Sequence, residues 1–201
     1  MAEFVNVSRA RRVIDLGCGA GTLLILLALK NTDAVFTGVE IVPESAETAR
    51  DNARRNAIGE RAEIITGDLR ELRGSVYNGQ YDHVVSNPPY FPVGGGKAAP
   101  DPLRAAARDE RFGTLSELCE AAARLCRWGG LFSLVHRPER LSEVFVAMTK
   151  HGIEPKRLRL VQAKEGAAPS LVLIEGRRGS KPGLLVEPPL VLIENVDDAA
   201  R

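Results

Sequence analysis

The sequence predicts an α/β protein with a doubly wound, mainly parallel sheet of seven strands that ends in an antiparallel hairpin. Short apolar segments typical of buried strands alternate with helical segments over most of the 201 residues. A glycine-rich segment, residues 15–21, joins the first of these strands to the first helix. The last two expected strands, residues 156–162 and 170–175, are joined by only a short turn-like stretch, so we expect one of them to run antiparallel to the rest.

Local signals set the boundaries of the other elements. Pro43 and Pro138 stand where helices begin, and Gly129-Gly130 turns a helix into the next strand. The tail from Lys181 is rich in proline and is predicted to be irregular, although residues 190–193 could add an edge strand. Strands are expected at residues 12–16, 34–40, 62–66, 81–86, 131–136, 156–162 and 170–175, and helices at residues 20–29, 44–56, 115–126 and 138–151.

The overall composition fits one globular domain, which we predict to span residues 1–201. Hydrophobic residues make up 44% of the chain and charged residues 26%, which supports a sizeable core and excludes a largely disordered chain. The net charge of +1 gives no reason to expect a nucleic-acid partner. Between Arg104 and Lys181, however, 15 Lys and Arg stand against 9 Asp and Glu, which indicates either a mildly basic face or ordinary solvated surface.

Cysteine usage and apolar runs favour a cytoplasmic protein. The three cysteines, Cys18, Cys119 and Cys126, form no CxxC pair and have no His-rich neighbours, so we expect neither a disulfide nor a metal site. The longest apolar run, residues 23–29, is too short to cross a bilayer, and the N-terminus lacks the pattern of a signal peptide. No membrane partner is therefore expected.

The glycine-rich segment has the form D-x-G-x-G-x-G, from Asp15 through Gly17, Cys18 and Gly19 to Gly21. Glycines let the backbone turn tightly and approach a ligand, and the following helix offers free N–H groups. The dinucleotide fingerprint G-x-G-x-x-G fits less well, because the third glycine comes one residue early. The segment instead resembles motif I of class I methyltransferases, whose ligand is S-adenosylmethionine.

Acidic residues at the ends of the next two strands support the same cofactor. Glu40 ends the second strand, where a carboxylate can accept hydrogen bonds from both ribose hydroxyls, and Ile41 beside it can pack on the adenine ring. Asp68, with Leu69 beside it, follows the third strand and is placed to accept a hydrogen bond from the adenine amino group. We therefore predict S-adenosylmethionine as the cofactor.

The loop Asn87-Pro88-Pro89-Tyr90 follows the fourth strand at the same edge of the sheet. A conjugated NH2 group is a poor nucleophile, because its lone pair is delocalised. The Asn87 side-chain oxygen and the Pro88 carbonyl can each accept one of its N–H bonds and so favour a pyramidal nitrogen, while the prolines fix φ. Tyr90 supplies a flat face on which the target ring can stack, and Phe91 is a further candidate substrate contact.

Other candidates carry weaker signals. Arg104, Arg108 and Arg111 could hold substrate phosphates or form a solvent-facing run. His83 and His136 show no metal spacing and no partner acids, so we assign them no catalytic role.

Taken together, these residues resemble those of the bacterial tRNA (adenine-N6)-methyltransferases that modify the adenine next to the anticodon of a valine tRNA. The likeness includes residues 15–21, 87–91, Ala107-Arg108-Asp109-Glu110, and the stretch Leu134-Val135-His136-Arg137-Pro138-Glu139-Arg140. The resemblance implies a Rossmann-like class I fold, a tRNA substrate and a flipped adenine held by Asn87, Pro88 and Tyr90.

The chain departs from this family at two points. Asp109 stands where members usually carry His, which puts contact with RNA phosphate there in doubt. Members also carry some tens of residues before the first strand, including a segment that covers the cofactor. Here that strand begins at Arg12, so we expect the cover to be missing.

Three other functions remain open from the sequence. A protein glutamine N5-methyltransferase would use the same loop, but such enzymes normally carry an N-terminal helical domain. Ribosomal RNA guanine-N2 methyltransferases often have Phe where Tyr90 stands. A non-enzymatic RNA-binding protein with a vestigial cofactor fold is the third alternative, against which the intact Asn87 and motif I speak.

Overall fold

The computed structural model of the chain describes residues 1–88 and 113–193. The strands are β1 (Arg12–Leu16), β2 (Val35–Glu40), β3 (Ala62–Thr66), β4 (Tyr81–Ser86), β5 (Cys126–His136), β6 (Ile153–Lys164), β7 (Leu171–Arg178) and β8 (Leu185–Ile193). The α-helices are α1 (Thr22–Lys30), α2 (Pro43–Arg55), α4 (Leu115–Leu125) and α5 (Leu141–Lys150), and short 3-10 turns cover Gly59–Arg61 and Pro138–Arg140. None of these helices is long and apolar enough to cross a membrane.

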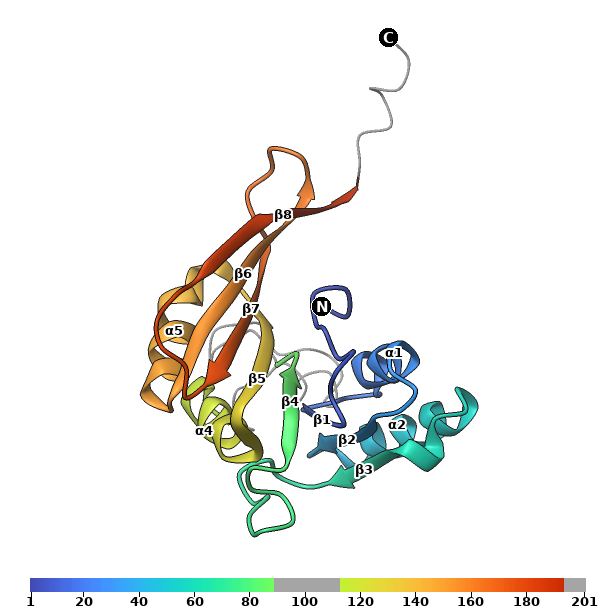
Figure 1. Ribbon diagram of the computed structural model, residues 1–201. Helices are drawn as coiled ribbons and strands as arrows, with labels where there is room; N and C mark the ends of the chain where they lie inside the picture. The colour runs from blue at the N-terminus through green and yellow to red at the C-terminus, as the bar shows by residue number, and fades with distance from the viewer. Residues whose placement is uncertain (89–112, 194–201) are drawn as a thin grey trace.

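The strands form one twisted sheet in the order β3-β2-β1-β4-β5-β7-β6-β8 (Figure 1). β1 to β5 pair in parallel, whereas β7 runs antiparallel to both of its neighbours, β5 and β6. The predicted α/β fold with an antiparallel C-terminal hairpin is therefore confirmed. The described sheet has eight strands rather than the predicted seven, because β8 adds an edge.

β8 corrects the prediction that the tail from residue 181 is irregular, which is wrong for residues 185–193. The strand pairs in parallel with β6, and Arg159 donates through its Nε to the Pro188 carbonyl oxygen at 2.9 Å. Pro188 and Pro189 lack an N–H group and weaken the sequence signal for a strand. They are tolerated here because β8 lies at the edge of the sheet, where one side of the strand needs no partner.

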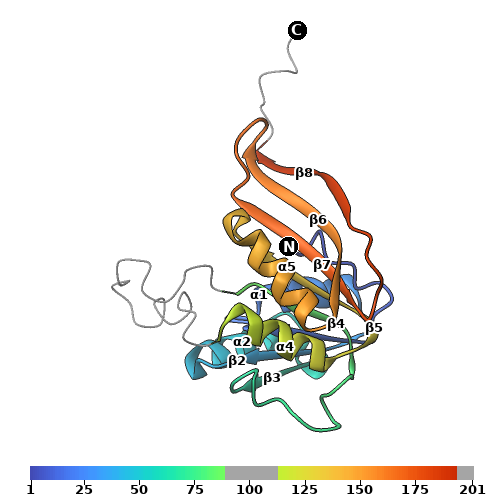
Figure 2. The same cartoon turned by 90° about the vertical axis from the view of Figure 1, so that its left-hand side faces the viewer.

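Helices cover both faces of the sheet (Figures 1 and 2). Successive residues of a strand point to opposite faces, so Val13 packs in the cluster that contains α1 and α2 while Ile14 packs in the cluster that contains α4 and α5. Both side chains are almost completely buried. The two apolar layers pack against the faces of the sheet, and the carboxyl ends of its strands stay available for a functional site.

A network of hydrogen-bonded polar side chains crosses the C-terminal half of the sheet. His83 Nε2 lies 2.8 Å from Ser133 Oγ, which donates to Glu175 Oε2 at 3.2 Å. Arg157 then bonds Glu175 Oε1 at 3.0 Å and Glu187 Oε1 at 2.7 Å. Burial lowers the pKa of His83 to about 4, so the ring is neutral at physiological pH. Sequence spacing did not indicate the acid near His83.

Arg157 has the most partners among these polar side chains, since it also lies 4.4 Å from the Phe4 ring centroid. It therefore connects the N-terminal segment to β7 and β8.

Arg157→Ala leaves the buried Glu175 without its cationic partner. We expect the free energy of unfolding to fall by about 2–4 kcal/mol, as measured by urea denaturation. The matched variant Arg159→Ala loses a single exposed bond and should cost less than about 1 kcal/mol. Equal losses in the two variants would contradict this role for Arg157.

Candidate functional site

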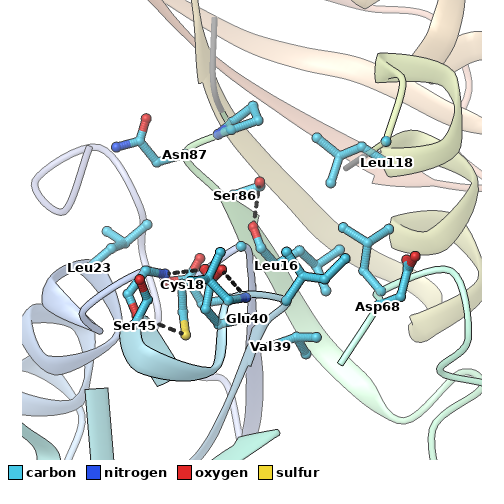
Figure 3. Close-up of a pocket in the computed structure, with 18 of the residues that line it drawn as sticks. Leu16, Cys18, Leu23, Val39, Glu40, Ser45, Asp68, Ser86, Asn87 and Leu118 are labelled. Atoms are coloured by element: carbon cyan, nitrogen blue, oxygen red, sulfur yellow. Dashed lines mark hydrogen bonds between the residues drawn. The ribbon is translucent and has the colours of Figure 1, made fainter. Parts of the chain in front are cut away.

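A cavity of about 330 Å³ opens at the carboxyl ends of the five parallel strands β1 to β5 (Figure 3). This volume lies within the range of small-molecule sites, and the carboxyl edge is where open α/β sheets bind ligands. The sequence-predicted residues that line it are Asp15, Gly17, Cys18, Gly19, Glu40, Ile41, Asp68, Leu69, Asn87 and Pro88. The structure thus brings together residues that follow four different strands.

The remaining predicted site residues have other positions. Gly21 is the N-cap of α1 and does not line the cavity; a Cβ there would lie 3.2 Å from Ala49 Cβ, so the glycine permits α1 to approach α2 closely. Six others lie outside the described residues: Pro89, Tyr90, Phe91, Arg104, Arg108 and Arg111. Their roles stay predictions.

The glycine-rich loop is attached to the end of β2. The N–H groups of Gly17 and Cys18 both donate to the Val39 carbonyl, at 2.8 and 3.0 Å. Gly17 and Gly19 have φ of +74° and +54° with no neighbouring atom in the place of a Cβ. These two glycines are therefore required by backbone conformation rather than by space.

Glu40 fixes the same loop through its side chain. Oε2 accepts from the Gly19 N–H at 2.8 Å, and Oε1 accepts from the Val42 N–H at 2.9 Å. The carboxylate is largely buried at 8% exposure, yet it lines the cavity. Each oxygen has a second lone pair, so Glu40 retains the capacity to bind a pair of ligand hydroxyls.

Asp15 is a buried carboxyl group at the site whose hydrogen bonds are incomplete among the described residues. Its side chain is 2% exposed, and Oδ1 has no hydrogen-bond partner among the described residues. Burial, followed by repulsion from Glu40, raises the pKa of Asp15 to about 7. An unpartnered buried acceptor of this kind is suited to a ligand that brings a cation or an N–H donor.

Asp68 already has a strong partner. The Arg70 guanidinium donates to both of its oxygens, with Nε at 2.9 Å from each, and lowers the pKa of this carboxyl. Arg70 also lies 3.3 Å from Glu117, in the first turn of α4. The sequence indicated Asp68 as a free acceptor, whereas here its remaining lone pairs must serve any ligand.

Asn87 and Pro88 leave β4 at the rim of the cavity. The strand end beneath them is fixed by Ser86, whose hydroxyl donates to the Leu16 carbonyl at 2.7 Å. In Figure 3, Asn87 and Asp68 lie on opposite sides of the cavity. Asn87 and Pro88 thus line the same cavity as Glu40 and the glycine-rich loop.

Sequence reasoning missed part of the lining from α4 and β5. Thr114, Leu115, Leu118 and His136 all line the cavity. Thr114 and Glu117 form a capping box at the start of α4, a signature that identifies the helix start but not what its first turn faces. His136 is 1% exposed, and its Nδ1 accepts from the Arg137 N–H at 2.9 Å.

The residues present fit a nucleoside that carries an amino acid group. Glu40 supplies acceptors for ribose hydroxyls, the positive-φ glycines leave room for close approach, and Asp15 supplies an unpartnered acceptor for an ammonium group. Leu69 and Leu118 add apolar surface for a flat ring. Among residues 1–88 and 113–193, no cluster of His, Cys, Asp or Glu could hold a metal ion.

Known methyltransferases are similar to this chain. The profile of a family described as "Methyltransferase domain" matches residues 8–152. A tRNA1(Val) (adenine(37)-N6)-methyltransferase from Tolumonas auensis is 32% identical over 175 residues, which cover 87% of this chain and 71% of the relative. Across relatives of this name the chain spans from 53% to 72% of their length.

Two other known proteins are also similar to this chain. A 4-amino-L-phenylalanine/4-methylamino-L-phenylalanine methyltransferase from Streptomyces pristinaespiralis is 36% identical over 138 residues, which cover 66% of this chain and 46% of that protein. A crystal structure of a predicted O-methyltransferase, Atu636 from Agrobacterium tumefaciens, superposes with a TM-score of 0.78 at 25% identity and covers 98% of this chain and 88% of that one.

The raised pKa of Asp15 predicts a specific pH dependence of stability. Folding raises this pKa from 3.8 to about 7, so the folded state holds the Asp15 proton more tightly than the unfolded state does. The resulting contribution to the free energy of unfolding is fully present below pH 4 and is lost as the pH rises towards 7. Asp15→Asn removes the charge. We expect the variant to be more stable than the wild type by roughly 3–4 kcal/mol at pH 8, with the difference vanishing near pH 4. Urea denaturation across this range measures it, and a difference independent of pH would contradict the assignment.

Proposed function

This chain belongs to the S-adenosylmethionine-dependent methyltransferases, and we propose that it methylates the exocyclic N6 amino group of an adenine in tRNA. One observation carries the proposal: Asn87 and Pro88, an acceptor pair for an NH2 group, line the same cavity as Glu40 and the glycine-rich loop. The donor and the acceptor of the methyl group can therefore meet in one cavity.

The residues of the chain orient the target amine and stabilise the charge that develops on it. The cofactor, when bound, supplies an electrophilic methyl group on a sulfonium. The Asn87 side-chain oxygen and the Pro88 carbonyl accept the two N–H bonds of the target amine, which turns the nitrogen lone pair towards that methyl group. No strong base is required, because the methylated nitrogen is acidic and loses its proton afterwards. This division of labour is typical of cofactor enzymes.

We assign cofactor contacts to residues of three strand ends. Glu40 binds the ribose, Asp15 the amino acid group, and Asp68 with Ile41 and Leu69 the adenine ring. Support comes from the lining of the cavity and from the unpartnered Asp15 oxygen. Asp68 fulfils this role only through lone pairs that Arg70 leaves available.

The choice of tRNA rests on the relatives of that name and on the Asn-Pro-Pro-Tyr loop that begins at Asn87. Tyr90 and Phe91 would stack on the flipped adenine, with Pro89 fixing the loop, and this substrate makes a cytoplasmic location the natural one. The arginines after the loop, Arg104, Arg108 and Arg111, would contact RNA phosphates.

A second candidate is methylation of an arylamine on a free amino acid. The relative from Streptomyces pristinaespiralis is named for 4-amino-L-phenylalanine, whose ring NH2 is conjugated in the same way as the adenine N6. An acceptor pair such as Asn87 and Pro88 suits either nitrogen. The cavity is therefore compatible with either conjugated amine, and the relatives named for tRNA favour adenine.

A substrate panel tests the proposal. The protein is incubated with tritiated S-adenosylmethionine and, separately, total tRNA, ribosomal RNA, release factor and 4-amino-L-phenylalanine. Labelled RNA is digested to nucleosides. We expect label in tRNA as N6-methyladenosine. Label only in guanine, in protein or in the free amino acid would contradict the adenine assignment, and the last result would establish the second candidate.

Substitution of Asn87 tests the role of the loop. Asn87→Ala removes one acceptor of the target amine, so we expect kcat to fall by at least about 100-fold while the dissociation constant of the cofactor changes little. Turnover with labelled cofactor and calorimetric titration give the two values. Asn56→Ala, an exposed asparagine of the α2 C-cap, is the matched control and should keep full activity. A large loss of cofactor affinity in Asn87→Ala would instead assign this residue to cofactor binding.

A further inference from the structure

The amino end of β5 displays the only tryptophan of the chain, far from the cavity. In the pairing of β4 with β5, Tyr81 is opposite Cys126 and His83 is opposite Leu131, so the single residue Asp82 faces the four-residue excursion 127–130. Gly130 permits it, because a Cβ there would lie 2.6 Å from Cys126 Sγ. Such bulges redirect side chains out of a sheet, and this one presents Trp128.

The Trp128 ring is held in position although it is 73% exposed. It lies so close over Gly179, at the end of β7, that a Cβ on Gly179 would be 2.2 Å from the indole. The Arg178 guanidinium lies 6.0 Å from the ring centroid and donates to the Cys126 carbonyl. Arg127 donates to the Trp128 carbonyl at 3.2 Å. One face of the ring is thus backed by the chain, while most of the side chain is open to solvent.

The charge around this ring is positive. Asp82 pairs with Arg127 Nε at 2.6 Å and accepts hydrogen bonds from the backbone N–H groups of Arg11 and Arg12. Arg178 comes from β7 on the other side. Two arginine side chains, Arg127 and Arg178, therefore lie near the exposed indole, and one carboxylate, Asp82, pairs with the first of them.

We propose that Trp128, flanked by Arg127 and Arg178, is an accessory site on which an unpaired base of the RNA substrate stacks; we call these three residues the Trp128 platform. Aromatic rings beside cationic side chains bind single-stranded nucleic acid by stacking on the base and neutralising the backbone. The inference rests on the proposed RNA substrate and adds a second contact to it. Isolated exposed apolar residues are common. A ring fixed against a glycine and flanked by two arginines, however, is suited to a partner that has both a flat base and an anionic phosphate backbone.

The geometry makes this contact independent of catalysis. β5 joins the platform to His136 at the cavity, and its stretch from Leu131 to His136 is roughly 17 Å long. The end of β7 and the start of β5 lie together at the end of the sheet away from the cavity (Figure 1). A folded RNA larger than this domain can reach both places at once, whereas a free amino acid or a single nucleoside cannot.

Because Trp128 is the only tryptophan, its fluorescence reports the platform alone. The full chain is titrated with total tRNA and with an oligouridylate of about 12 nucleotides, and tRNA binding is measured in parallel by filter retention. We expect both RNAs to quench the emission. Trp128→Ala should weaken tRNA binding by about 5- to 150-fold and raise KM for tRNA, while kcat at saturating tRNA is unchanged. Trp128→Phe keeps a stacking face and should lose much less.

The control variant is Val146→Ala, which removes an equally exposed apolar side chain from α5 and should bind tRNA as the wild type does. Cofactor titration checks that each variant is folded. Methylation of tRNA with equal KM in the wild type and Trp128→Ala, or filter-bound tRNA without quenching, would overturn the platform and leave the proposed function intact. A wild type that methylates no RNA but methylates 4-amino-L-phenylalanine would overturn the proposed function and the platform together.

Discussion

The carboxylate of Glu40 holds together the two loops from which the cavity is built. Its oxygens accept one N–H from Gly19, after β1, and one from Val42, after β2, so neighbouring parallel strands end in a single bonded unit. The glycine-rich loop keeps its positive φ angles within this unit. Ligand binding by the same carboxylate would act on a loop already in place, which reduces the ordering cost of binding.

Much of this frame follows from local sequence. The strands at Ala62–Thr66 and Tyr81–Ser86 coincide with their predicted limits, because each is a short apolar run between turn residues. The glycine-rich loop and Glu40 lie where the alternation of strands and helices places them. Parallel strands present their carboxyl ends at one edge, so residues distant in sequence could be assigned to one site.

Other features depend on contacts that no local pattern contains. The pairing of Arg70 with both Asp68 and Glu117 joins a loop to a helix forty-seven residues away in sequence, and the lining by Leu118 depends on how α4 packs. His83 acquires its acidic neighbour through β5 and β7. Tyr90 and the arginines after it lie outside the described residues and stay predictions.

The prolines of β8 have a consequence for how copies of the chain meet one another. β8 is the outer edge of the sheet and exposes apolar side chains at Leu185, Val186, Leu192 and Ile193, a composition that favours self-association through added strands. Pro188-Pro189 cannot donate hydrogen bonds and divides this edge into two short stretches. The same two prolines that weaken the sequence signal for this strand therefore also limit strand pairing between copies at this edge.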